Sequence, residues 1–102
     1  MVLRVRPERE KEYIEYHAAV WPDVLELICD CRIRNYSIYL KDAFLFAYFE
    51  YHGTDYEADM KKMAASAAMQ KWWELMESMQ DPIPTRKPGE WWARMDEVFH
   101  TD

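Results

Sequence analysis

The stretch IRNYSIYLKDAFLFAYFEY, residues 33–51, decides the fold of this chain. Residues 33–40 and 44–51 are rich in aromatic and β-branched side chains, which favour strands, and Lys41-Asp42 between them predicts a tight hairpin turn. The second strand is apolar on both faces: Leu45, Ala47 and Phe49 on one, Phe44, Phe46 and Tyr48 on the other. A strand of this composition is central in its sheet and covered on both sides.

The segment before the hairpin predicts one strand and two helices. Residues 2–6 alternate weakly and end at Pro7, which is the pattern of a short edge strand. Pro7 suits the first turn of a helix, because the N–H that it lacks would have no partner there. Pro22 interrupts this helix, since a proline clashes with the preceding turn and has no N–H to donate. A second helical segment begins at about Asp23.

Polar residues mark the starts of two more helices after the hairpin. Thr54 and Glu57 match a capping box, in which the hydroxyl and the carboxylate close the first turn of a helix. Ser66 is the expected cap of a further helix. Residues 81–89 contain three prolines and are not helical. Residues 95–100 are predicted to form the last strand.

The order β, α, β, β, α, β is that of a split βαβ arrangement. We therefore predict an α+β fold, a ferredoxin-like (split βαβ) sandwich of the dimeric α/β-barrel type, in a single domain over residues 1–102. The helices are sufficient to cover one face of a four-stranded sheet, which leaves the second apolar face of residues 44–51 open. An exposed apolar face of this extent is typical of a subunit interface, so we expect a two-fold homodimer.

Composition limits the partners and the compartment. Thirteen Lys and Arg against nineteen Asp and Glu give a net charge of −6, which argues against nucleic acid and anionic membranes. No apolar run is long enough for a membrane helix, and the residues before Pro7 are too few for a signal peptide. Cys29 and Cys31 are too close together for a relaxed disulfide or a metal knuckle. We therefore expect free thiols, no metal site and a cytoplasmic protein.

Tyr13 and His17 are the first candidates for chemistry. Their spacing of four residues places a phenol and an imidazole one turn apart on the same side of a helix. Histidine is the one side chain that serves as both acid and base near neutral pH without a perturbed pKa. By spacing alone, a histidine at the rim of the core that binds a carbonyl or water is the more common interpretation.

Two tandem tryptophan pairs, Trp72-Trp73 and Trp91-Trp92, are the second unusual feature. Adjacent helical residues point about 100° apart, so one ring of the first pair can face the core while the other faces a cleft. An indole face packs well against the C–H groups of a sugar ring, although both rings could equally fill core and interface. No phosphate-binding loop, nucleotide fingerprint or Ser/Cys nucleophile motif is present, so any chemistry is expected to need no cofactor.

Taken together and in order, six stretches resemble the L-rhamnose mutarotase family. They are residues 13–17, 20–22, 34–40, 45–47, 70–73 and 97–99, and they span nearly the whole chain. The resemblance implies a dimeric ferredoxin-like fold and an isomerase that interconverts the α and β anomers of L-rhamnose without a cofactor. By position, His17 matches the proton-donating residue of the family. The sugar-contacting positions of the family match Tyr13, Tyr36, Trp72 and Trp73.

Three points stay open at the level of sequence. Tyr36 and Tyr39 lie on opposite faces of a regular strand, so only one faces a pocket unless a bulge intervenes; the resemblance selects Tyr36. The roles of Trp91 and Trp92, and the choice between L-rhamnose, L-fucose and other 6-deoxy sugars, are not fixed. The alternative functions are a sugar-binding module without catalysis and a small monooxygenase-like enzyme of the dimeric α+β-barrel type.

Overall fold

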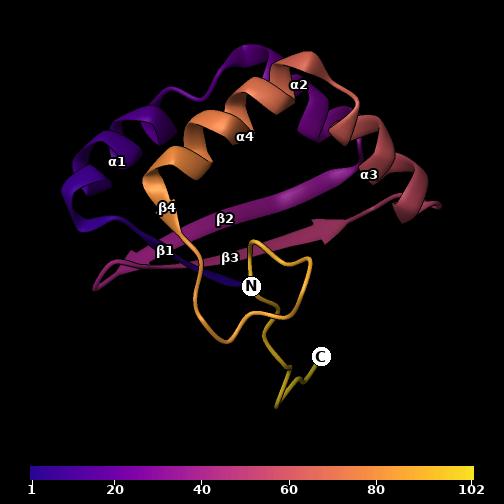
Figure 1. Ribbon diagram of the computed structural model, residues 1–102. Helices are drawn as coiled ribbons and strands as arrows, with labels where there is room; N and C mark the ends of the chain where they lie inside the picture. The colour runs from indigo at the N-terminus through magenta and orange to yellow at the C-terminus, as the bar shows by residue number, and fades with distance from the viewer.

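The computed structural model describes all 102 residues and consists of one antiparallel sheet with helices on one face (Figure 1). The sheet has the order β2-β3-β1-β4. Its strands are β1 (Val2–Val5), β2 (Ile33–Lys41), β3 (Phe44–Tyr51) and β4 (Gln80–Asp81). This order, with antiparallel pairing throughout, is the predicted ferredoxin-like arrangement.

The helices begin where the sequence provides a proline or a cap. They are the 3₁₀ turn η1 (Pro7–Arg9), α1 (Glu10–Ala18), α2 (Pro22–Asp30), α3 (Tyr56–Ala64) and α4 (Ala67–Met79). Pro22 stands in the first turn of α2, and the Ser66 hydroxyl accepts a hydrogen bond from the Met69 N–H at the start of α4. None of these helices has the length and apolarity needed to cross a bilayer.

The cap of α3 differs from the prediction by one residue. Asp55, and not Thr54, is the N-cap, and its carboxylate accepts a hydrogen bond from the Ala58 N–H. A carboxylate caps as well as a hydroxyl and also favours the positive end of the helix dipole. Glu57 pairs with Lys61 one turn along the helix instead of closing a capping box.

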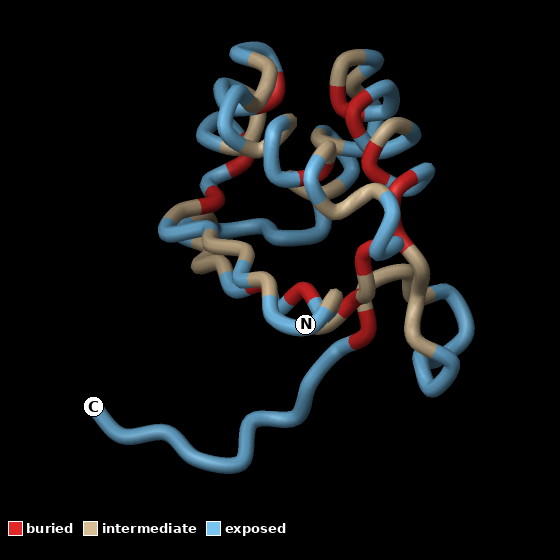
Figure 2. The backbone as a smooth tube through the Cα atoms, turned by 90° about the vertical axis from the view of Figure 1, so that its left-hand side faces the viewer, coloured by how far each residue is buried: buried red, intermediate tan, exposed pale blue.

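Two strand predictions were wrong. The segment at residues 2–5 is not an edge strand, because β1 lies between β3 and β4 in the sheet. Residues 95–100 form no strand; they extend away from the sheet and are exposed (Figure 2). The fourth strand is instead Gln80–Asp81, directly after α4, and Ala93 continues that edge with a single bridge to Val2.

The β2–β3 hairpin forms as predicted, with one irregularity that reorients a side chain. The chain turns at Asp42 and Ala43, which both have positive φ, so β2 extends to Lys41. The pairing of β2 with β3 shifts register between Arg34 and Ser37, where Asn35 has φ +49°. This bulge places two residues of β2 opposite one residue of β3.

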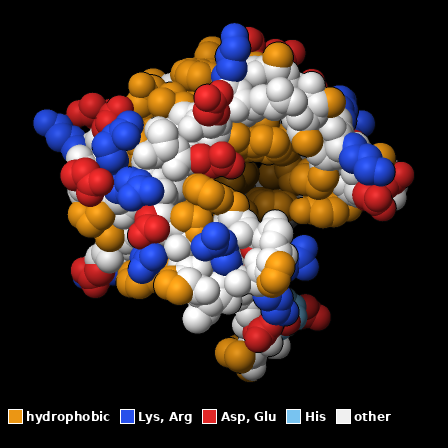
Figure 3. Space-filling view, viewed as in Figure 1, with side chains coloured by type: hydrophobic (Ala, Val, Ile, Leu, Met, Phe, Trp, Pro, Cys, Tyr) orange, Lys and Arg blue, Asp and Glu red, His pale blue; other side chains and the backbone are white.

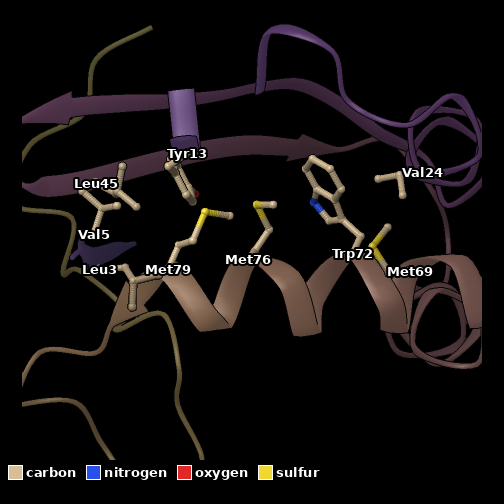
Figure 4. Close-up of a cluster of buried hydrophobic side chains, with 9 residues drawn as sticks. All are labelled: Leu3, Val5, Tyr13, Val24, Leu45, Met69, Trp72, Met76 and Met79. Atoms are coloured by element: carbon tan, nitrogen blue, oxygen red, sulfur yellow. The ribbon is translucent and has the colours of Figure 1, made fainter. Parts of the chain in front are cut away.

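The core lies between the sheet and the helices (Figure 4). Trp72, Met76 and Met79 of α4 point toward Tyr13 of α1 and the side chains of β1 and β3. The opposite face of the sheet carries exposed aromatic rings, as the predicted alternation of β3 requires. They are Tyr39, Phe44, Phe46 and Tyr48.

Candidate active site

A cavity of about 600 Å³ opens between α1, α2, α4 and the sheet. Its lining is almost entirely hydrophobic and includes four of the five predicted site residues: Tyr13, His17, Tyr36 and Trp72. A second cavity of about 320 Å³ shares these four side chains and continues under α3 and α4. Figure 3 shows the resulting hollow between helices and sheet, with hydrophobic side chains around its opening.

Tyr13 and His17 form one unit within α1. Their ring centroids are 4.2 Å apart, and His17 Nδ1 lies 2.8 Å from the backbone carbonyl oxygen of Tyr13. A carbonyl oxygen can only accept, so Nδ1 carries the hydrogen and donates it. The lone pair of the neutral imidazole is therefore on Nε2. That atom has no protein partner and is not sealed from solvent, which makes it available to a ligand.

The surroundings of His17 keep its imidazole neutral. Burial in the apolar cavity lowers the pKa of His17 below its ordinary value, and the hydrogen bond to the Tyr13 carbonyl opposes this only in part. Tyr13 responds to the same burial in the opposite sense, because its charged form is the anion: the pKa of its hydroxyl rises to about 12. At neutral pH the site thus holds a free base next to a protonated phenol.

The lowered pKa of His17 determines the pH range in which its imidazole can act as a base. We expect any reaction that uses His17 as a base to become faster with rising pH through the pKa of His17 and to reach half of its maximal rate below pH 6.5, the ordinary value. The same group links folding to pH: the unfolded chain binds the proton more readily, so stability falls as the pH drops from 6.5 toward the folded pKa. A rate profile measured between pH 4.5 and 8 whose half-maximum lies above pH 6.5 would contradict the lowered pKa.

Trp72 closes the inner end of the cavity. Its ring meets His17, Trp21 and Tyr16 edge to face, with centroid distances of 5.6, 5.1 and 6.4 Å. Its indole N–H has no protein partner and is not sealed from solvent, so it remains free for a ligand. Trp73, its neighbour in α4, does not reach the first cavity and lines only the second. Trp72 therefore lines both cavities, whereas Trp73 lines only the second.

The bulge in β2 decides between Tyr36 and Tyr39. Tyr36 follows the bulge residue Asn35 and lines the cavity, where its ring packs against Phe49 at 5.4 Å between centroids. Tyr39 is 64% exposed on the opposite face of the sheet. Without the extra residue, regular alternation would place the Tyr36 side chain on the face of the sheet opposite to that of Ile33.

Two residues that the sequence did not assign to the site lie behind Tyr13. The Gln80 amide nitrogen donates to the Tyr13 hydroxyl oxygen at 3.2 Å, and the Gln80 amide oxygen accepts from the Trp91 indole N–H at 2.8 Å. No local signal marks a glutamine after a helix as part of a site. The only clue in the sequence is the second tryptophan pair, whose role had no assignment.

The structure contains no group of three or more His, Cys, Asp and Glu side chains that could hold a metal ion. The lining of the first cavity carries no charged carboxylate or ammonium group, and its polar atoms are hydroxyl, imidazole and indole groups. The second cavity adds Glu77 and Met1. The lining of the first cavity suits a neutral ligand that has both apolar faces and hydroxyl groups.

Comparisons of this sequence with protein families and with curated proteins agree on one family. The model of the family described as L-rhamnose mutarotase matches residues 1–101. The L-rhamnose mutarotase of Phocaeicola vulgatus is 36% identical over 99 residues, which cover 96% of this chain and 91% of the relative. The L-rhamnose mutarotase of Bacteroides thetaiotaomicron is 31% identical, with coverage of 96% and 91%.

A solved structure supports the fold independently. The crystal structure of an L-rhamnose mutarotase from Formosa agariphila superposes with a TM-score of 0.74 at 21% sequence identity. The match covers 99% of this chain and 94% of that chain. At this identity the likeness concerns the arrangement of strands and helices.

Proposed function

Because this chain belongs to the L-rhamnose mutarotase family, we propose that it interconverts the α and β anomers of L-rhamnose and that His17 moves the proton. The observation that carries the assignment of His17 is its neutral imidazole, whose Nε2 is open to an uncharged cavity beside two phenols. The proposed reaction is an isomerisation of a neutral sugar. It needs only proton transfer, so we propose that it proceeds without a cofactor.

The proposed mechanism transfers one proton between two oxygens of the same sugar. His17 Nε2 removes the proton of the anomeric hydroxyl while the bond between C1 and the ring oxygen breaks, and the imidazolium returns a proton to that ring oxygen. The open-chain aldehyde rotates about the C1–C2 bond, and the reverse steps close the ring on the other face of C1. General acid–base catalysis of this kind contributes about 10²–10⁴-fold.

Three of the other four predicted residues hold the sugar in this proposal, whereas Trp73 lines only the second cavity. The hydroxyl groups of Tyr13 and Tyr36 and the N–H of Trp72 provide polar contacts to the edge of the ring. The apolar lining between them faces the C–H groups and the methyl group of a 6-deoxy sugar. A methyl contact discriminates between sugars by only about 1–3 kcal/mol, so activity on related sugars is expected to fall gradually.

The test is anomer exchange, measured by saturation-transfer NMR on a panel of 6-deoxy sugars. Exchange on L-rhamnose that exceeds the uncatalysed rate supports the proposal. Exchange that is unchanged on every sugar contradicts it, and rhamnose binding without faster exchange would indicate a sugar-binding module. Oxygen consumption with an aromatic substrate would indicate the monooxygenase alternative.

We also propose that the protein is a cytoplasmic homodimer. The support for the compartment is that Cys29 and Cys31 are both free thiols. The support for the dimer is the uncovered sheet face, where Tyr39, Phe46 and Tyr48 are 64%, 38% and 57% exposed. A second copy would remove these rings from water through a self-complementary interface.

Phe46→Glu tests the dimer. A carboxylate at the centre of the open face would have to be buried unpaired, so we expect the variant to elute as a single chain in size-exclusion chromatography with light scattering. Lys71→Glu, on the exposed outer side of α4, is the control and is expected to keep the mass of the unaltered protein. A Phe46→Glu variant with the mass of two chains would place the interface elsewhere.

A further inference from the structure

Gln80 is the one buried amide in this chain. It is 3% exposed, and the other thirteen buried residues are all of hydrophobic type. It follows the last residue of α4 and pairs with Val5 in the short strand β4. A buried amide is costly unless both of its ends have hydrogen-bond partners, and both ends of Gln80 have one.

The two partners leave Gln80 a single orientation. The indole N–H of Trp91 is a donor only, so the group that faces it must be the amide oxygen of Gln80. The amide nitrogen then faces the hydroxyl of Tyr13. If the amide were flipped, two donors would face each other at the Trp91 end, and a buried donor would lose its partner. Trp91 therefore fixes the direction of the whole chain of hydrogen bonds.

This direction leaves the hydrogen of the Tyr13 hydroxyl without a protein acceptor. The amide N–H of Gln80 uses a lone pair of the Tyr13 oxygen, so the hydroxyl hydrogen is not needed for that contact. No protein acceptor takes this hydrogen, and Tyr13 lines the cavity. Burial keeps the phenol protonated at neutral pH. The hydroxyl is thus a donor aimed at a ligand rather than an acceptor.

We propose that Gln80, held by Trp91, is a positioning residue that makes the Tyr13 hydroxyl a hydrogen-bond donor to an oxygen of the bound sugar. The proposal rests on the proposed function for the identity of the ligand. It extends the site to the C-terminal segment, because Trp91 lies beyond the proline-rich loop at residues 82–88, donates its indole N–H to Gln80 and lines the second cavity. It also gives Trp91 a role that its sequence did not reveal.

Gln80→Glu reverses this hydrogen bond with almost no change in shape. Once ionised, a carboxylate at position 80 still accepts from the Trp91 indole, but it accepts from the Tyr13 hydroxyl as well and takes that hydrogen away from the sugar. Burial raises the pKa of such a carboxyl, so the assay is run at alkaline pH, where it has lost its proton. We expect KM for L-rhamnose to rise about tenfold, the worth of one directed hydrogen bond, while kcat changes by less than about threefold. Gln70→Glu, at an exposed glutamine of α4, is the control and is expected to leave KM unchanged.

A double-mutant cycle separates positioning from packing. Tyr13→Phe removes the hydroxyl, so Gln80→Glu should cause no further rise in KM when it is combined with Tyr13→Phe. A purely structural role of Gln80 would lower the melting temperature and would raise KM equally in both backgrounds. Effects that multiply, or a Gln80→Glu protein with the KM of the unaltered protein, overturn the proposal.

Trp91→Phe provides an independent variant if Gln80→Glu does not fold. It removes the donor that fixes the amide, and we expect KM to rise about threefold, again only when Tyr13 is present. Trp92→Phe is its control, since no protein group accepts from the Trp92 indole. The dissociation constant of L-rhamnose, measured by NMR titration, distinguishes failure of the proposed function from failure of the proposed role of Gln80. Tight binding without anomer exchange counts against the proposed function. A dissociation constant that is unchanged in Gln80→Glu counts against the positioning role of Gln80.

Discussion

His17→Ala is expected to lower the rate of anomer exchange by about 10²–10⁴-fold, the usual contribution of general acid–base catalysis. The reason is that no other group in the cavity can replace it. The Tyr13 hydroxyl has a pKa of about 12, so it is protonated at neutral pH and is not a base there, and no carboxylate lines the first cavity. The measurement is saturation-transfer NMR on L-rhamnose with the purified variant.

Two comparisons make the His17→Ala result specific. His52→Ala removes an exposed histidine that pairs with Glu50 at the end of β3, and it is expected to keep full activity. Added imidazole should restore part of the exchange in His17→Ala, because the substitution leaves space beside a cavity of about 600 Å³. Full exchange in His17→Ala without imidazole would remove His17 from the proton-transfer role.

The hairpin and the helices follow from local sequence signals. Aromatic and β-branched residues in residues 33–51 predict both strands, and Pro22 and Ser66 mark the starts of their helices. Each of these signals acts within a few residues, which is why the sequence is sufficient to place the elements. It is also sufficient to bring Tyr13 and His17 to one side of α1.

Features that depend on distant segments were less predictable. The central place of β1 depends on β4 and Ala93, which follow it by more than seventy residues. β4 itself is only two residues long, and its strand conformation comes from pairing with β1 rather than from its own composition. Residues 95–100 have a better strand composition, yet they find no neighbouring strand within the chain.

The site residues also differ in whether local sequence or distant segments determine their positions. Tyr36 faces the cavity because Asn35 occupies the left-handed region at φ +49°, a conformation that asparagine tolerates better than most residues. Asn35 is further held by a hydrogen bond from its amide to Glu50 on the neighbouring strand. Gln80 and Trp91 were not predicted, because their partners are 67 and 11 residues away and only the fold brings them together.

Trp72→Ala is expected to lower the free energy of unfolding by about 3–5 kcal/mol, the range for a large aromatic side chain removed from a core. Trp72 is 7% exposed and joins α4 to α1 and to the N-cap of α2 through its contacts with Tyr16, His17 and Trp21. For a chain of this length the loss corresponds to a fall in melting temperature of at least about 12 °C. The measurement is urea unfolding followed by circular dichroism.

The neighbouring residue supplies a control of identical chemistry. Trp73 is 38% exposed and lines only the second cavity, so less of its ring leaves water on folding. Trp73→Ala should therefore cost no more than roughly half as much as Trp72→Ala, because stabilisation follows the apolar area buried. Equal losses for the two substitutions would mean that both rings belong to the core and that the tandem pair is not divided between core and cleft. A larger loss for Trp73→Ala would point to a partner surface that covers its ring in solution, since the isolated chain leaves much of that ring exposed.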